Sequence, residues 1–262
     1  MQKLTFLALL LLITINVSSQ NIENPKKGFS MNVLTYNTHH CSPPASGGID
    51  IDGIAGVIIS SKADVVLLQE IDKNVSRSGN TDQIKLLSEK TNLVYFQFFK
   101  AINLGEGEYG TAILSRYPIS ESFTHILKLN PGTEQRVMGS VVINLPKSEK
   151  MFIGSAHLDL DSNMRFLQVK QIDSIVMSKK MAAIFGGDFN ASPESSEIRY
   201  LTNKYEQSAK TFLPTFPNVK PNKTIDYIFK NNYGTTEFIS HTVISDVNAS
   251  DHLPVLSKIL VF

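Results

Sequence analysis

Acidic, amide and imidazole residues recur where apolar runs of this chain end. Asn37 follows one such run, Glu70 a second and His157 a third. The others are Asp188 and Asn190 after the run 182–185, Asp226 within 225–229, and Asp251 with His252 before the last run. Polar groups at the ends of strands can converge on one rim of a sheet. We therefore expect these side chains to form one site.

This set of side chains contains the groups that cleavage of a phosphoester requires. Glu70, Asp251 and the amide of Asn37 are hard oxygen ligands, which suit Mg²⁺ and also Mn²⁺. Such an ion binds a phosphoryl oxygen and offsets the charge that develops during reaction. Asp188 beside Asn190 can orient an attacking water, and two histidines can transfer protons or donate to the transition state. The single cysteine argues against a structural zinc site.

Short apolar runs rich in β-branched residues must position these groups, and each is typical of a strand. The predicted strands are 32–36, 64–68, 94–99, 111–114, 137–145, 151–157, 182–185, 224–229 and 255–260. Helical spacing appears over 52–61, 82–91, 164–177 and 193–201. We expect the last helix to begin with Ser192 as its N-cap and Pro193 as its first residue.

The arrangement of these elements indicates the fold class. Many strands, few helices and several hairpin-length connections favour an α/β fold of two packed mixed β-sheets flanked by helices over a doubly wound parallel sheet. The chain has no low-complexity stretch, no repeat of fixed period and no linker. We therefore predict a single domain over residues 20–262.

Four segments in chain order make a family resemblance specific. They are Tyr36-Asn37, Gln69-Glu70, Gly187-Asp188-Phe189-Asn190 and Ser250-Asp251-His252. With the triplets 155–157 and 225–227, they resemble the endonuclease/exonuclease/phosphatase superfamily over nearly the whole of 20–262. The resemblance implies a four-layered α/β sandwich of two mostly antiparallel sheets, with the site at one edge of both. The segments 76–79, 108–110 and 215–217 are most similar to small exported members.

The same resemblance implies a role for each matching residue. Glu70 is the expected principal metal ligand, and Asn37 and Asp251 are expected close to the metal. Asp188 and Asn190 are expected to position the nucleophilic water and the scissile phosphate. The reaction is then an in-line attack by water with metal support, without a covalent intermediate.

Two histidines are implied to act on opposite sides of the phosphate. His252, oriented by a hydrogen bond to Asp226, is expected to serve as base or charge stabiliser. His157 is expected to serve as acid or donor from the other side. The sequence leaves open which histidine is the base and which is the acid.

Four further residues are candidates for substrate binding. Arg136 matches the position where relatives place a phosphate-contacting arginine before a strand, and an exposed salt-bridge arginine is the alternative. Arg77 lies in a polar loop, where it either contacts a headgroup or is simply solvated. His40 is a candidate for the pocket wall. Glu108 is a candidate for orienting His157.

The N-terminal segment has the pattern of a secretory signal peptide over residues 1–19. Lys3 precedes an apolar run over 4–17, and Ser18 and Ser19 follow it. The run is shorter than the roughly 20 residues that span a bilayer, which disfavours a membrane anchor. We therefore expect cleavage near Ser19, a secreted or periplasmic mature chain without a transmembrane span, and no obligate protein partner.

The charge of the chain bears on the substrate. The full chain has a formal charge of +1, and Lys3 is the only charged residue of the signal segment, so the mature chain is formally neutral. The strongly basic footprint of many nucleic-acid-binding proteins is absent. We expect a Mg²⁺-dependent phosphodiesterase or phosphatase acting on a lipid headgroup, an inositol phosphate or another small phosphoester. The alternatives are a secreted nuclease acting on nucleic acid and an inactive binding module; the complete acid, base and metal set disfavours the latter.

Overall fold

The computed structural model describes residues 28–45 and 47–262, so the predicted signal segment lies outside the described residues. The helices of the described chain are α1 (Ile51–Ser61), α2 (Gln83–Thr91), α3 (Ser162–Ser178) and α4 (Ser196–Thr202), with 3-10 turns η1 (His39–Cys41), η2 (Ser76–Ser78) and η3 (Pro146–Ser148). No helix in this part of the chain has the length and apolar character needed to cross a membrane.

Within the same residues the strands form two six-stranded sheets. In spatial order, the first sheet contains β11 (Thr236–Val243), β12 (Val255–Val261), β1 (Phe29–Asn37), β2 (Val65–Lys73), β4 (Gly107–Ser115) and β3 (Tyr95–Leu104). The second contains β5 (Ile119–Ile126), β6 (Val137–Asn144), β7 (Lys150–His157), β8 (Ala183–Asp188), β10 (Asp226–Lys230) and β9 (Glu206–Gln207). One pair in each sheet is parallel, β1 with β2 and β7 with β8, and the other described pairs are antiparallel.

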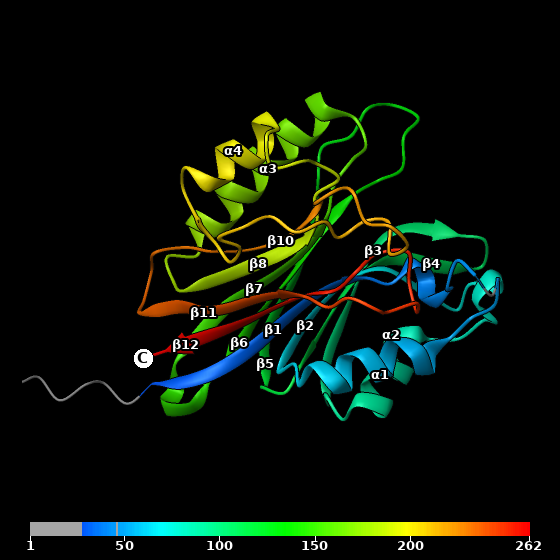
Figure 1. The fold of residues 1–262 in the computed structure, drawn as a ribbon, viewed down its shortest axis with the longest axis horizontal. Coiled ribbons are helices and arrows are strands. Elements are labelled where there is room, and N and C mark those ends of the chain that lie inside the picture. The colour runs from blue at the N-terminus through cyan, green and yellow to red at the C-terminus, as the bar shows by residue number, and fades with distance from the viewer. Residues whose placement is uncertain (1–27, 46) are drawn as a thin grey trace, which may run out of the picture.

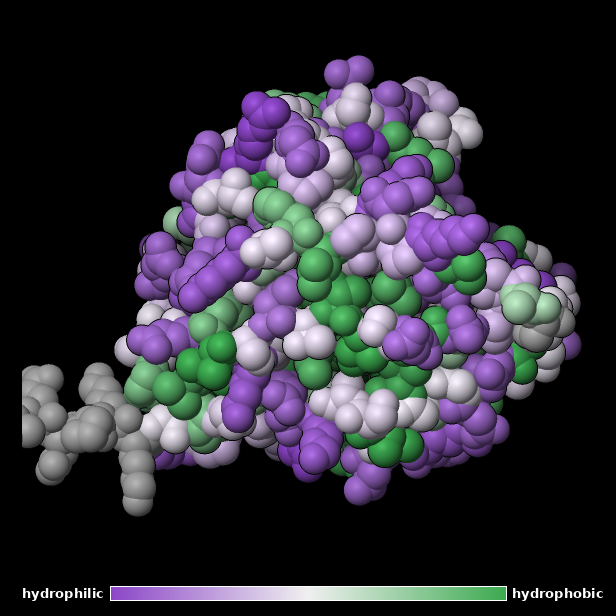
Figure 2. Space-filling model, viewed as in Figure 1, coloured by the Kyte–Doolittle hydropathy of each residue, from purple (hydrophilic) through white to green (hydrophobic). Residues whose placement is uncertain are grey.

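The two sheets pack face to face, with helices outside them. Val33, Leu67, Ile153 and Ile184 belong to the core between the sheets. Helices α1 and α2 bury their apolar residues against the outer face of the first sheet, and α3 and α4 cover the second, which gives four layers (Figure 1). On the face drawn in Figure 2, hydrophobic residues gather near the centre and hydrophilic residues dominate the periphery. The predicted four-layered α/β sandwich is confirmed.

All nine predicted strands are present, but β5, β9 and β11 were not predicted. All three are edge strands of their sheets. Most residues of β5 and β11 are at least partly exposed, so neither strand carries a continuous apolar run. The predicted start of the last helix is wrong. Helix α4 begins at Ser196, because the side chain of Ser195 accepts a hydrogen bond from the Ile198 N–H and caps it.

Strand β2 does not end at Glu70, as the apolar run suggested. It continues to Lys73, with its pairing to β4 interrupted by a bulge between Leu68 and Ile71. Glu70 lies in this bulge with φ of 58°. A bulge bends a strand and re-aims a side chain, so the carboxylate of Glu70 reaches the site from within a strand instead of from its end.

Candidate active site

The two parallel strand pairs end at the same edge of the sandwich. Asn37 at the end of β1 pairs with Gln69, and His157 at the end of β7 pairs with Asp188 at the end of β8. Asp226, the first residue of β10, is the antiparallel partner of Asp188. A cavity of about 420 Å³ opens there, lined by His39, His40, Glu70, Arg77, Ile102, Leu104, Tyr109, Glu134, Arg136, His157, Leu160, Asp188, Asn190, Phe216, Asp251 and His252.

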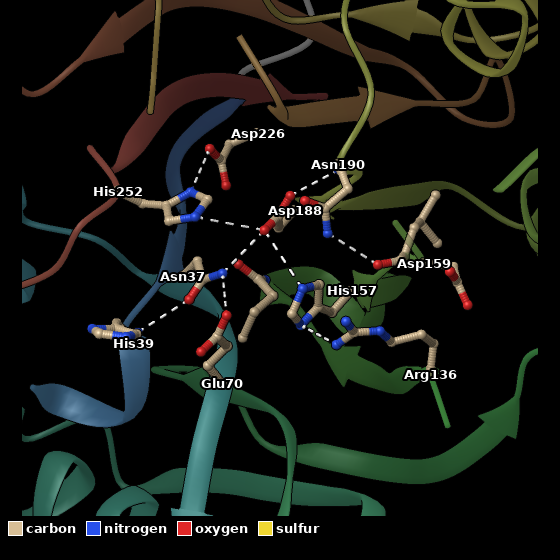
Figure 3. Close-up of polar contacts among 12 residues, drawn as sticks. Asn37, His39, Glu70, Arg136, His157, Asp159, Asp188, Asn190, Asp226 and His252 are labelled. Carbon is tan, nitrogen blue, oxygen red and sulfur yellow. Dashed lines mark hydrogen bonds and ion pairs between the residues drawn. The ribbon is translucent and has the colours of Figure 1, made fainter. Parts of the chain in front are cut away.

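Asp188 is the point at which the polar groups of the site converge (Figure 3). Its Oδ2 accepts a hydrogen bond from Asn37 Nδ2 at 3.0 Å and lies 3.6 Å from His157 Nε2 and 3.7 Å from His252 Nε2. Its Oδ1 accepts from the Asn190 N–H at 2.8 Å. The side chain is 2% exposed, and this burial raises the pKa of Asp188 while the charge of His252 offsets part of the effect.

The sequence before Asp188 permits this placement. Gly187 has φ of 142°, and a Cβ built on it would lie 1.9 Å from the carbonyl oxygen of Ala156 on the neighbouring strand. Only glycine allows the backbone of β8 to approach β7 this closely. The Gly-Gly before Asp188 therefore brings this carboxylate beside His157 at the strand ends.

His252 forms a buried pair with Asp226, as predicted. Its Nδ1 lies 3.0 Å from Asp226 Oδ2. Burial lowers the pKa of His252, but the charges of Asp226 and Asp188 and the hydrogen bond to Asp226 outweigh burial and raise it to about 10. The ring therefore carries a proton at neutral pH and presents a cationic N–H toward Asp188.

His157 is in the opposite protonation state. Burial lowers its pKa well below the usual value, and the positive charges of Arg136 and His252 lower it further. Arg136 Nη1 lies 3.3 Å from His157 Nδ1, and a guanidinium group can only donate. Nδ1 is therefore the acceptor, and the neutral ring carries its proton on Nε2, which faces Asp188. The structure thus gives the two histidines different protonation states, a distinction that the sequence left open.

Asn37 connects Glu70 to Asp188. Its Nδ2 donates to Glu70 Oε1 and to Asp188 Oδ2, each at 3.0 Å, and its Oδ1 accepts from the His39 N–H at 3.1 Å. With its carbonyl engaged in this way, Asn37 orients two carboxylates. Its direct role as an oxygen ligand to a metal stays a prediction.

The donor set of the cavity fits a divalent cation. Four carboxylates line the cavity, from Glu70, Glu134, Asp188 and Asp251, and they outnumber the cationic groups Arg77, Arg136 and protonated His252. A cation bound among these carboxylates would offset their repulsion of a phosphate group. Oxygen ligands of this kind suit Mg²⁺ or Mn²⁺.

Asp188, Asp226 and His252 also bring one ligand-type atom each to within 4.8 Å of one another and could together hold a metal ion. The protonated ring of His252, however, has no lone pair to give, and its nitrogens already face the two carboxylates. As arranged, the trio is an ion-pair network, and the role of Glu70 and Asp251 as ligands of a hard cation stays a prediction.

Three of the four substrate-binding candidates line the cavity. Arg77 makes two hydrogen bonds of 2.8 Å to the buried carboxylate of Asp72, which fixes its guanidinium group at the wall. His40 is neutral, because burial and then the charge of Arg77 lower its pKa to about 4. Arg136 forms an ion pair with Glu134 at 2.7 Å and contacts His157, but its side chain is only 12% exposed, so it is not an exposed salt-bridge arginine. Its contact with a phosphate stays a prediction.

The expected role of Glu108 is wrong. Its carboxylate forms ion pairs with Lys100 at 3.2 Å and Lys73 at 4.0 Å, outside the cavity. Successive side chains of β4 point to opposite faces of the sheet, and the neighbouring Tyr109 is the residue that lines the cavity. Strand β4 is buried along almost its whole length, so its sequence shows no alternation that could have identified Tyr109.

Leu160 also lines the site without having been predicted to do so, and Phe216 lines it from the loop 212–223, one of the loops that the sequence offers for the pocket wall. The Phe216 ring centroid lies 4.8 Å from that of His252. Leu160 lies in the connection from β7 to α3 and Phe216 in the connection from β9 to β10, where periodicity gives no indication of direction.

A family model described as the Endonuclease/Exonuclease/phosphatase family matches residues 34–252, a span that contains the site from Asn37 to His252. The chain belongs to this family. Its members hydrolyse phosphoesters. The chain is 21% identical over 249 residues to the uncharacterized protein YbhP of Escherichia coli K12, covering 88% of this chain and 96% of YbhP.

Solved structures share the fold of this family member. An endonuclease/exonuclease/phosphatase from Beutenbergia cavernae superposes with a TM-score of 0.77 at 20% identity, covering 88% of this chain and 72% of that one. A mannosyl-6-phosphatase from Bacteroides thetaiotaomicron superposes with a TM-score of 0.68 at 17% identity, covering 88% of this chain and 100% of that one. At these identities the likeness concerns the fold alone.

Proposed function

We propose that this family member is a divalent-metal-dependent phosphoester hydrolase, a phosphodiesterase or phosphatase that acts on a lipid-borne or small phosphoester. The observation that carries the proposal is the arrangement around Asp188, a buried carboxylate between a protonated and a neutral histidine. We also propose that the mature chain is the single domain 20–262, secreted or periplasmic after cleavage near Ser19.

Asp188 orients the attacking water and takes its proton. Its raised pKa improves the carboxylate as a general base, and such a base contributes about 10²–10⁴-fold. Asn190 belongs to the same turn, and its N–H holds the other oxygen of Asp188 in place. The attack is in line with the leaving group, and no side chain of the site needs to form a covalent intermediate.

The two histidines act as donors from opposite sides. His252, kept cationic by Asp226, stabilises the negative charge that grows on the phosphoryl oxygens. His157 presents Nε2–H to the same region, and Arg136 keeps it in that tautomer. Arg136 and Arg77 add two guanidinium groups at the cavity wall for the remainder of the anionic substrate.

Glu70 and Asp251 are the residues that would hold the ion, with Asn37 orienting the carboxylate of Glu70. When bound, Mg²⁺ or Mn²⁺ supplies charge neutralisation at the phosphoryl group. The four carboxylates among the residues that line the cavity support this requirement.

A lipid-borne substrate is supported by apolar residues at the cavity. Ile102, Leu104, Leu160 and Phe216 line it together with the polar groups, and Leu160 is 73% exposed at its edge. Apolar side chains that line a polar site suit an amphiphilic substrate better than a nucleic acid backbone.

A substrate panel tests the proposal. The purified mature protein is incubated with Mg²⁺ and phosphatidylinositol, sphingomyelin, inositol phosphates, a sugar phosphate, plasmid DNA or RNA, with EDTA controls. Release of phosphate or headgroup from lipid or small substrates, with DNA and RNA untouched, supports it. Plasmid nicking that EDTA abolishes, together with an affinity for DNA that falls steeply as the salt concentration rises, would make the protein a nuclease. Silence across the panel would favour an inactive binding module.

A further inference from the structure

One short segment, the strap Thr215–Asn218, lies across the site and touches both sheets. The Thr215 Oγ1 accepts hydrogen bonds from the N–H groups of Ile225 at 3.2 Å and Asp226 at 3.3 Å, at the start of β10 in the second sheet. The Thr215 carbonyl accepts from the Leu253 N–H at 2.7 Å, just before β12 in the first sheet. Thr215 therefore connects the backbone of Asp226 to the residue that follows His252.

The strap contacts this pair in two further ways. The Phe216 ring packs against the His252 ring at a centroid distance of 4.8 Å. The Asn218 N–H donates to the Asp251 carbonyl at 2.6 Å. Thr215 itself is 1% exposed, so its hydroxyl lies inside the protein and is not a group that meets substrate.

The pair of His252 and Asp226 needs such a connection because Asp226 begins β10 of the second sheet, whereas His252 precedes β12 of the first sheet. Figure 1 shows these two strands in their separate sheets. His252 lies before β12 and outside its ladder, so strand pairing does not fix it. Asp226 is bound to His252 through Oδ2 alone, and its buried Oδ1 has no hydrogen-bond partner among the described residues. The direction of this carboxylate therefore depends on where its backbone is held.

We propose that Thr215 is a positioning residue. Its hydroxyl and carbonyl hold the backbones of Asp226 and of the residue after His252, and so keep the Asp226 carboxylate and the His252 ring in position relative to each other. The inference rests on the proposed function insofar as the pair is part of the catalytic site. Thr215 acts through the pair, and the Phe216 ring limits rotation of the His252 ring from the cavity side.

The substitution Thr215→Val tests this role, because valine keeps the shape of threonine and removes the acceptor. Two backbone N–H groups lose this acceptor, and the Asp226 carboxylate is free to shift relative to His252. A misplacement of about 1 Å in a catalytic constellation costs about 100-fold, so we expect kcat to fall by about 10- to 100-fold. KM should change less than threefold, because Thr215 does not line the cavity.

Two variants control for a merely structural effect. Thr215→Ser keeps the hydroxyl and should restore kcat to within about threefold of the wild type. Thr111→Val makes the same isosteric change at another buried threonine, whose Oγ1 has no hydrogen-bond partner in the described chain. It should leave kcat unchanged, and thermal unfolding should show that all three variants are folded at the assay temperature.

A second readout does not depend on turnover. The Nδ1–H proton of His252, hydrogen-bonded to Asp226, should give a downfield ring-proton resonance in the NMR spectrum. Thr215→Val should shift or broaden this resonance, whereas Thr111→Val and Thr215→Ser should leave it in place. An unchanged resonance with unchanged kcat in Thr215→Val would overturn the inference. A protein that hydrolyses no substrate but shows the resonance shift would refute the proposed function and still support the positioning role.

Discussion

Replacing Asp188 by asparagine should separate activity from stability. The change keeps the shape of the side chain and removes the charge that lies between His157 and His252. Loss of a general base costs about 10²–10⁴-fold, so we expect kcat/KM to fall by at least about 100-fold. A 100-fold loss corresponds to about 2.7 kcal/mol of transition-state stabilisation.

The effect on stability follows from the neighbours of the two carboxylate oxygens. Whichever way the new amide is turned, its NH₂ group faces a donor, either Asn37 Nδ2 or the Asn190 N–H. Losing one hydrogen bond to a charged group costs about 1.5–3 kcal/mol. Relief of the buried charge, whose desolvation raises the pKa of Asp188, offsets this cost. The free energy of unfolding should therefore stay within about 2 kcal/mol of the wild type.

Both quantities are measured on the same preparations, with urea denaturation in EDTA and steady-state kinetics on the best substrate in Mg²⁺. Asp52→Asn is the matched control, because this side chain is 83% exposed and forms its ion pair with Lys90 at the surface. A variant of Asp188 that keeps more than one tenth of wild-type activity would refute the assignment of this carboxylate as the base. So would a loss of activity explained fully by unfolding.

Three further predictions concern other parts of the molecule. Burial raises the pKa of Asp173, but hydrogen bonds from Lys204 and two tyrosines outweigh it and lower the pKa. A carboxyl with a lowered pKa contributes stability above its usual pKa and loses it as the pH falls through the lowered value. Asp173→Asn should thus cost about 2 kcal/mol in urea denaturation at pH 7 and much less at pH 2. Glu108→Gln should leave kcat/KM within twofold of the wild type, since its carboxylate pairs with Lys100 outside the cavity; a tenfold loss would restore its predicted role. Mg²⁺ at 100 times its Kd should stabilise the wild type by about 2.7 kcal/mol in thermal unfolding, and Glu70→Gln should lose most of this gain.

Much of the fold could be predicted from the sequence because the central strands are buried on both faces. Strands such as β2 and β8 therefore contain continuous apolar runs, and the end of β8 shows directly in the sequence as Asp188. The end of β2 does not, because the strand continues past its apolar run to Lys73. Edge strands such as β5 and β11 lack this property, since most of their side chains are at least partly exposed. The bulge at Glu70 could not be predicted, because a bulge is a feature of pairing with β4 and not of local composition.

The sequence predicted which residues form the candidate site better than it predicted their protonation states. Asn37, His157 and His252 come together at Asp188 as expected. The protonation states of the two histidines depend on which groups surround each ring in space, and no sequence spacing reveals that Arg136 contacts His157. The contribution of the strap Thr215–Asn218 depends in the same way on contacts between segments distant in the chain.

The central claim is that this site hydrolyses phosphoesters with a divalent cation. The most direct test is turnover of the best panel substrate by the purified protein, first stripped with EDTA and then titrated with Mg²⁺ or Mn²⁺. We predict no turnover in EDTA and saturable recovery with either ion, absent in Asp188→Asn. Turnover that persists undiminished in EDTA, or equal turnover by wild type and Asp188→Asn, would contradict the account.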